Sequence, residues 1–160
     1  MRLRMMDRKL IRDRIAALLE LIGSTRAAGP SLEQELAHRL DALALVMHGL
    51  DIACDIRDYA DPPVWTYEER RRICSERFPF LGFYNDVSLL STQVGEGEAV
   101  VADAIDDLAD IASELEAVSW RWNNTSVEDA LWHLQESYRT HWGRHLRGLQ
   151  LYLHSRASAE

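Results

Sequence analysis

The residues best suited to bind a metal ion are two histidines near the C-terminus. His141 and His145 are four residues apart in a region of helical periodicity, so their imidazoles lie on one helix face, one turn apart. Two imidazoles fall short of the three or four protein ligands that metal sites use, so a third ligand must come from another helix. The alternative is a pair of packed, hydrogen-bonded histidines beside Trp142.

A second polar group lies in the middle of the second expected helix. His48, Asp51 and Asp55 are spaced three and four residues apart, which places them on one side of that helix. The helix is apolar on two other faces, which is typical of a central helix. Two interpretations remain open. The group forms a structural ion-pair network with the arginines at 70–72, or it lines a pocket that binds a small ligand or metal.

The third group is an acidic run in the fourth expected helix. Its members are Asp103, Asp106, Asp107, Asp110 and Glu114. Paired carboxylates at such spacings can hold Mg²⁺. A helical wheel, however, places all five acids opposite the apolar stripe that contains Ile105 and Leu108. We therefore expect them to face solvent.

Tryptophan is concentrated near the C-terminus. Four of the five lie in the last two expected helices: Trp120, Trp122, Trp132 and Trp142. On the wheel, Trp142 belongs to the buried stripe, whereas Trp122 and Trp132 stand off it. Tryptophan is enriched at interaction hot spots, so we expect Trp132 to contribute to a partner-binding surface.

Composition excludes several classes of function. The 160 residues include 18 basic and 26 acidic side chains, and the net charge of −8 disfavours nucleic-acid binding. No apolar run approaches the roughly 20 residues needed to cross a bilayer. Without an export signal, Cys54 and Cys74 are best interpreted as reduced thiols of a cytoplasmic protein. Nucleophile motifs and phosphate-binding glycine loops are absent, so we assign no catalytic residue, metal or cofactor.

The periodicity predicts the elements that must position these residues. Five helices are expected, at about 7–22, 32–58, 66–77, 98–122 and 125–154, and no segment alternates as a strand would. Capping boxes at Ser31 and Thr66 begin the second and third helices. We therefore predict an all-α fold, a single up-and-down helical bundle over residues 1–160. Its last two helices form a long antiparallel hairpin, and its first can lie at the periphery.

Three motifs of the C-terminal half resemble a known family. They are Asp106-Asp107-Leu108-Ala109-Asp110-Ile111, Asp129-Ala130-Leu131-Trp132, and Ser137-Tyr138 followed by Trp142-Gly143. In this order, over about residues 98–154, they are similar to the bacterial domain-of-unknown-function family numbered 5063. The resemblance implies a bacterial, cytoplasmic, all-helical protein and brings no catalytic residue.

The resemblance also bears on individual residues. The residue before Trp-Gly is not reliably histidine in that family, so a metal site at His141 and His145 would be peculiar to this chain. Asp107 and Asp110 belong to the family pattern. Either they pair with the connection at 79–97 or they form a docking surface.

Taken together, the sequence favours a non-enzymatic interaction or scaffold domain. Its partner would be a protein or a second copy of the chain, bound through the acidic helix face or the tryptophan-rich hairpin. The alternative is a ligand-binding or metal-binding bundle, with hydrolysis as an added activity. Its polar pocket would lie between the second and fifth helices, built on His48, Asp51, Asp55 and His145.

Overall fold

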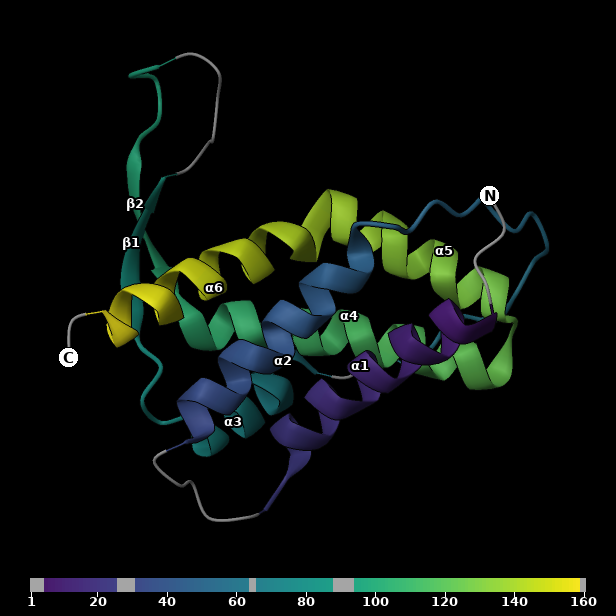
Figure 1. The fold of residues 1–160 in the computed structure, drawn as a ribbon, viewed down its shortest axis with the longest axis horizontal. Helices are drawn as coiled ribbons and strands as arrows, with labels where there is room; N and C mark the ends of the chain where they lie inside the picture. Colours follow the sequence, from purple (N-terminus) through teal and green to yellow (C-terminus); the bar gives the residue numbers. More distant parts are fainter. Residues whose placement is uncertain (1–4, 26–30, 64–65, 88–93, 159–160) are drawn as a thin grey trace.

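The computed structural model describes residues 5–25, 31–63, 66–87 and 94–158. The chain is mostly helical and carries one small two-stranded sheet (Figure 1). In chain order the elements are α1 (Met5–Gly23), α2 (Leu32–Met47), α3 (Tyr67–Arg77), β1 (Phe83–Val87), β2 (Ala99–Asp103), α4 (Ala104–Asn124), α5 (Val127–Ser137), the π-helical turn η1 (Tyr138–Trp142) and α6 (Gly143–Ala157). Among the described helices, none has a stretch long and apolar enough to span a bilayer.

Side-chain caps begin three of the helices. Thr66 accepts a hydrogen bond from the amide of Glu69 at 3.3 Å, which confirms the predicted cap of α3. Asp103 caps α4 and Ser126 caps α5 in the same way. The predicted box at Ser31 is wrong, because its side chain makes no capping bond and only its carbonyl accepts from the helix.

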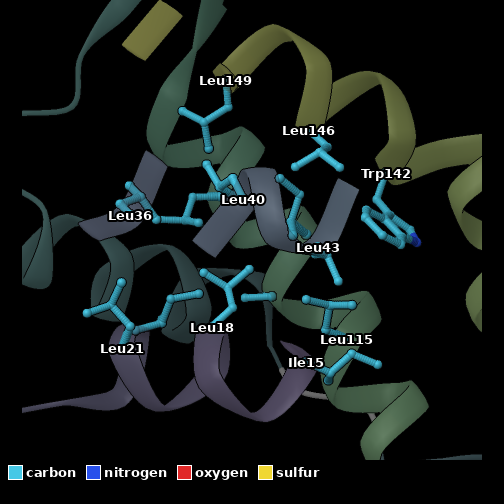
Figure 2. Close-up of a cluster of buried hydrophobic side chains, with 14 of the residues drawn as sticks. Ile15, Leu18, Leu21, Leu36, Leu40, Leu43, Leu115, Trp142, Leu146 and Leu149 are labelled. Carbon is cyan, nitrogen blue, oxygen red and sulfur yellow. The ribbon is translucent and has the colours of Figure 1, made fainter. Parts of the chain in front are cut away.

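The hydrophobic core takes buried side chains from each of the helices α1 to α6. Figure 2 shows part of this cluster, with Leu18 of α1, Leu40 of α2, Leu115 of α4 and Leu146 of α6 among its side chains. Leu18, Leu40 and Leu146 are fully buried there, and Trp142 closes one end of the cluster. Side chains spaced three and four residues apart supply these contacts, as expected for amphipathic helices.

The central helix is α4, which packs against α1, α3, α5 and α6. Its buried residues therefore extend well beyond the stripe around Ile105. Ile111 and Asp107, which are four residues apart, are both buried on the side that the wheel assigned to solvent. The expectation of one covered face was wrong because α4 is enclosed from more than one direction.

Helix α2 ends at Met47, eleven residues before the predicted end. Gly49 follows in a turn, and glycine disfavours helix continuation. The next segment is tied to α5 instead. Gln135 binds both the amide and the carbonyl of Ile52, and Ser126 donates to Asp55. Tertiary hydrogen bonds have replaced the helical ones that the apolar pattern predicted.

The connection between α3 and α4 contains the antiparallel hairpin of β1 and β2, so the all-helical expectation needs correction. In its register Phe83 pairs with Asp103, Asn85 with Val101 and Val87 with Ala99. Residues 99–103, predicted to be helical, pair as β2 instead. The hairpin projects beyond the helices in Figure 1.

The last helical segment runs from α5 through η1 into α6 and packs along α4. The wider turn η1 interrupts it between Ser137 and Gly143. Gly143 is required at this place, since a Cβ there would lie 2.3 Å from the carbonyl oxygen of Tyr138. The Trp-Gly motif therefore marks the π-helical turn.

Candidate functional site

Five side chains form an imidazole–carboxylate cluster where α4 meets η1 and α6. Its members are Asp107, Asp110, Glu114, His141 and His145. Nδ1 of His145 lies 2.7 Å from Oδ1 of Asp107, and Nδ1 of His141 lies 2.9 Å from Oε1 of Glu114. Each imidazole therefore has one nitrogen bound to its own carboxylate.

The other nitrogen of each imidazole faces Asp110. Oδ2 of Asp110 lies 3.5 Å from Nε2 of His145 and 3.9 Å from Nε2 of His141. One ligand atom from each of these three residues lies within 4.8 Å of the others. Ligands held tetrahedrally at about 2.1 Å from an ion are about 3.4 Å apart. The three side chains are thus close to the spacing that a bound ion requires.

The carboxylates determine which imidazole nitrogen carries the proton. An ionised carboxylate only accepts hydrogen bonds, so Nδ1 of each histidine donates to its partner. In the neutral ring Nε2 is then the unprotonated nitrogen, which can bind an ion beside Asp110; in the imidazolium it is a second donor to that carboxylate. Metal-binding histidines commonly show this arrangement, with the remote nitrogen held by a carboxylate.

Electrostatics at the cluster favour a cation. Partial burial raises the pKa of Asp110, and the neighbouring carboxylates of Asp106 and Asp107 raise it further, against the attraction of His145. The hydrogen bond to Asp107 raises the pKa of His145, while burial opposes that shift. A positive charge beside Asp110 relieves the repulsion among these carboxylates.

Exposure differs across the cluster. Asp107 is buried, with 6% of its surface accessible, whereas Asp110 and His145 are half-buried and His141 is exposed. Asp107, which orients the ring of His145, is therefore shielded from water. The three residues that could bind an ion are accessible from solvent.

The π-helical turn contributes to this arrangement. His141 lies within η1, and His145 lies in the first turn of α6. Their rings remain close, with centroids 5.1 Å apart. Single π-helical turns inside α-helices occur frequently at functional sites.

The sequence prediction for this region is partly corrected. The carboxylate that lies beside both histidines belongs to Asp110 of α4 and not to a residue of the second helix. The assignment of Asp107 to a solvent-facing docking surface is wrong, because Asp107 is buried. Instead it accepts a hydrogen bond from Tyr84 in the connection at 79–97.

The group at His48, Asp51 and Asp55 is not on one helix face, because α2 ends before it. His48 and Asp51 are exposed. Asp55 is bound by Arg57 through two nitrogens, at 2.9 and 2.6 Å, and by hydroxyls of Tyr59 and Ser126. These hydrogen bonds, that of Arg57 foremost, lower the pKa of Asp55. The bond from Ser126 connects the irregular segment to the start of α5.

The arginines at 70–72 do not pair with that group. Arg70 binds Glu116, Arg71 binds Asp103 at 2.5 Å, and Arg72 binds Glu76 at 2.9 Å. The predicted network with the second helix is therefore wrong, since α3 packs on α4 and its charges pair mainly there.

A groove of about 840 Å³ lies between α2 and α6. Its lining includes His38, Asp41, Arg147 and His154, but none of His48, Asp51 or Asp55. Gln150 donates to Asp41 across it at 2.6 Å.

Trp132, the remaining candidate, is half-buried on α5, where its ring packs edge-on against His133.

Sequence reasoning missed Tyr84 as a member of this region. It occurs in the connection at 79–97, which the sequence offered as one of two partners for Asp107 without naming a residue. Nothing in the spacing links residue 84 to residue 107, because the contact depends on how the hairpin folds back onto α4.

Comparison with known proteins defines the class of the chain. The domain of unknown function DUF5063 matches residues 65–158, which include α3 to α6 and the hairpin, and the chain belongs to this family. The fold is similar to the crystal structure of protein BF1032 from Bacteroides fragilis, with a TM-score of 0.66 and 19% identity. The similarity covers 92% of this chain and 87% of that protein. No curated protein matched the chain.

Proposed function

We propose that this chain binds a divalent transition-metal ion at Asp110, His141 and His145. The observation that supports the proposal is the direction of both Nε2 atoms toward Oδ2 of Asp110, at 3.5 and 3.9 Å. A neutral imidazole that donates from Nδ1 presents an unprotonated Nε2, which is the atom that a metal ion binds. Convergence of this kind is what an ion requires.

The ligand types favour one class of ion. Two imidazoles and a carboxylate suit Zn²⁺, Co²⁺, Ni²⁺ or Fe²⁺, whereas Mg²⁺ and Ca²⁺ prefer oxygen ligands throughout. Three protein ligands leave at least one coordination position for water or another small ligand, as in catalytic rather than closed structural zinc sites.

Calorimetric titration of the metal-free chain with Zn²⁺, Co²⁺ and Mg²⁺ tests the proposal. We expect Zn²⁺ and Co²⁺ to bind with one equivalent and Mg²⁺ to give no signal. Asp110→Asn and His145→Ala should abolish binding, because each removes one of three ligands. His154→Ala is the matched control, since it removes an exposed imidazole of α6 outside the cluster.

Equal Zn²⁺ binding by His145→Ala and by His154→Ala would contradict the proposal. It would assign the heat to surface histidines instead of the cluster. Bound Co²⁺ provides an independent check, because its visible absorption reports whether nitrogen ligands are present.

The hairpin supports a second candidate, a protein-interaction role. Phe83 and Val101 are 72% and 73% exposed, and with Val87 they are exposed apolar residues on one side of the two strands. Exposed apolar patches of this kind mark interaction sites.

The free thiols Cys54 and Cys74 support a reducing, cytoplasmic setting for either role.

The oligomeric state tests this second candidate, with another copy of the chain as the partner. Sedimentation should show a concentration-dependent dimer that Phe83→Ser with Val101→Ser removes. Ile56→Ser is the control, because Ile56 is 95% exposed and lies outside the hairpin. A monomer at all concentrations would exclude the second copy, and loss of the dimer in the control would exclude the hairpin.

A further inference from the structure

Tyr84 connects the hairpin to the imidazole–carboxylate cluster. Its hydroxyl donates to Oδ2 of Asp107 at 2.5 Å, while Oδ1 of the same carboxylate accepts from Nδ1 of His145 at 2.7 Å. Burial, followed by the bond to Asp107, raises the pKa of Tyr84. The phenol therefore keeps its proton at neutral pH and acts as a donor.

Gly148 makes room for this contact. A Cβ on Gly148 would lie 2.5 Å from the hydroxyl oxygen of Tyr84 and 3.6 Å from its Cζ. Since nonbonded carbon–oxygen contacts of that length are not tolerated, any larger residue would displace the hydroxyl. The ring is held from the side by Tyr152, stacked at a centroid distance of 5.0 Å. Helix α6 thus supplies both the ligand His145 and, three residues later, the gap for Tyr84.

We propose that Tyr84, Asp107 and Gly148 form a positioning relay that presents Nε2 of His145 to the bound ion. The inference rests on the proposed metal site and names residues that never touch the ion. Because both oxygens of Asp107 are engaged, the carboxylate is held in one orientation and His145 in one tautomer. The ring is then ordered before the ion arrives, so binding does not carry that ordering cost.

The relay links the hairpin to the ion. Tyr84 lies on β1. Arg144 of α6 also binds this strand, since its guanidinium donates to the carbonyl oxygen of Val87 at 2.6 Å. If the docked hairpin strengthens ion binding by some factor, the ion must strengthen hairpin docking by the same factor. Residues 83–87 should therefore exchange their amide hydrogens more slowly when the ion is bound.

Zn²⁺ affinities of relay variants test the proposal. Tyr84→Phe removes the hydroxyl and keeps the ring on Tyr152, while Gly148→Ala keeps the hydroxyl and displaces it. Each should weaken Zn²⁺ binding by about 10- to 100-fold, the usual effect of removing an outer-shell partner. The double variant should bind Zn²⁺ about as tightly as the more affected single variant, because both changes break the same hydrogen bond between Tyr84 and Asp107.

Tyr67→Phe is the matched control. It removes a tyrosine hydroxyl that binds Asp106, an acid of α4 that is not a ligand in the proposed site. Its Zn²⁺ affinity should stay within about twofold of the wild type. Nitrogen NMR of His145 in the metal-free chain should show the Nδ1-protonated tautomer in the wild type and a mixture in Tyr84→Phe.

The two proposals fail in different ways. Wild-type affinity in both Tyr84→Phe and Gly148→Ala would overturn the relay and leave the metal site intact. No Zn²⁺ binding by the wild type would overturn the proposed function and the relay with it. Circular dichroism identifies a variant that fails to fold, and in that case the other single variant decides.

Discussion

Histidines lie beside buried aspartates in two places, and the two places differ in what neutralises the carboxylate. At the junction of α4 and α5, Arg121 lies between Asp129 and Asp61, at 3.1 and 3.3 Å. Thr125 also donates to Asp129 at 2.6 Å. In the imidazole–carboxylate cluster, by contrast, three carboxylates face two imidazoles.

The pKa values of the two histidines reflect this difference. Burial and the charge of Arg121 lower the pKa of His133, which lies 3.4 Å from Asp129. The bond to Asp107 raises the pKa of His145. Asp129 is thus paired with a permanent cation, whereas Asp107 and Asp110 are paired with an imidazole whose charge depends on pH. The charge balance distinguishes the two sites better than the residue types do.

The largest expected effect is the loss of stability when Arg121, at the junction of α4 and α5, is removed. Arg121→Met should lower the free energy of unfolding by about 3–5 kcal/mol, because it leaves Asp129 buried without a counter-charge. Urea denaturation followed by circular dichroism measures the change. Arg72→Met is the control. It breaks an exposed pair with Glu76 and should cost less than about 1 kcal/mol. Similar losses of unfolding free energy in Arg121→Met and Arg72→Met would contradict a structural role for the pair of Arg121 with Asp129.

Zn²⁺ should stabilise the chain only through the imidazole–carboxylate cluster. At a free ion concentration 100 times the dissociation constant, the wild type should gain about 2.7 kcal/mol. Asp110→Asn should gain nothing, and its metal-free stability should not fall, because partial burial and the neighbouring carboxylates disfavour the ionised form of Asp110. Thermal melts with and without Zn²⁺ measure both quantities. A large loss of metal-free stability in Asp110→Asn would make this cluster structural as well.

The π-helical turn gives an intermediate effect. Gly143→Ala should cost about 1–3 kcal/mol, because the new Cβ would lie 2.3 Å from the carbonyl of Tyr138 and one of the two must move. Zn²⁺ affinity should fall with it, since His145 follows two residues later. Gly23→Ala is the control, as a Cβ there meets nothing within 4 Å. Unchanged stability in Gly143→Ala would show that the turn relaxes freely.

The smallest effect is a pH dependence of opposite sign at the two histidines. His145, whose folded pKa is raised, adds stability below its unfolded pKa of about 6.5, and this stability is lost as the pH rises through the folded value. His133, whose folded pKa is lowered, adds stability above the unfolded pKa, and this is lost as the pH falls through the folded value.

Metal-free variants reveal these opposite slopes. Lowering the pH from about 7.5 to about 5.5 should increase the stability lost in His145→Gln and decrease that lost in His133→Gln. Denaturation curves at the two pH values measure the differences. Slopes of the same sign would contradict the electrostatic contrast between the two places.

Helix positions followed from the sequence where local signals agreed. Thr66 and the acidic first turn begin α3, and the helix expected at about 7–22 is present as α1, with Ile11, Ile15 and Leu18 buried. The prediction failed at residues 48–58 and 99–103. There the chain exchanges helical hydrogen bonds for bonds to Gln135 and Ser126 or to a neighbouring strand. Such long-range partners leave no local periodicity.

The candidate site was half predictable for the same reason. Spacing alone placed His141 and His145 on one helix face, since four residues make about one helical turn. Asp110 was set aside because the wheel assumed one covered face on α4. Contacts with four other helices enclose α4 and bring that acid to the histidines.

The sequence by itself determined helical content, the family, the pair of imidazoles and the acids that could neutralise a cation. Only the tertiary structure decided which acid meets which histidine, that Asp107 is buried, and that Tyr84 reaches it past Gly148. The physical reason is that local periodicity depends on neighbours within one turn. The charge environment of a side chain depends instead on elements that arrive from anywhere in the chain.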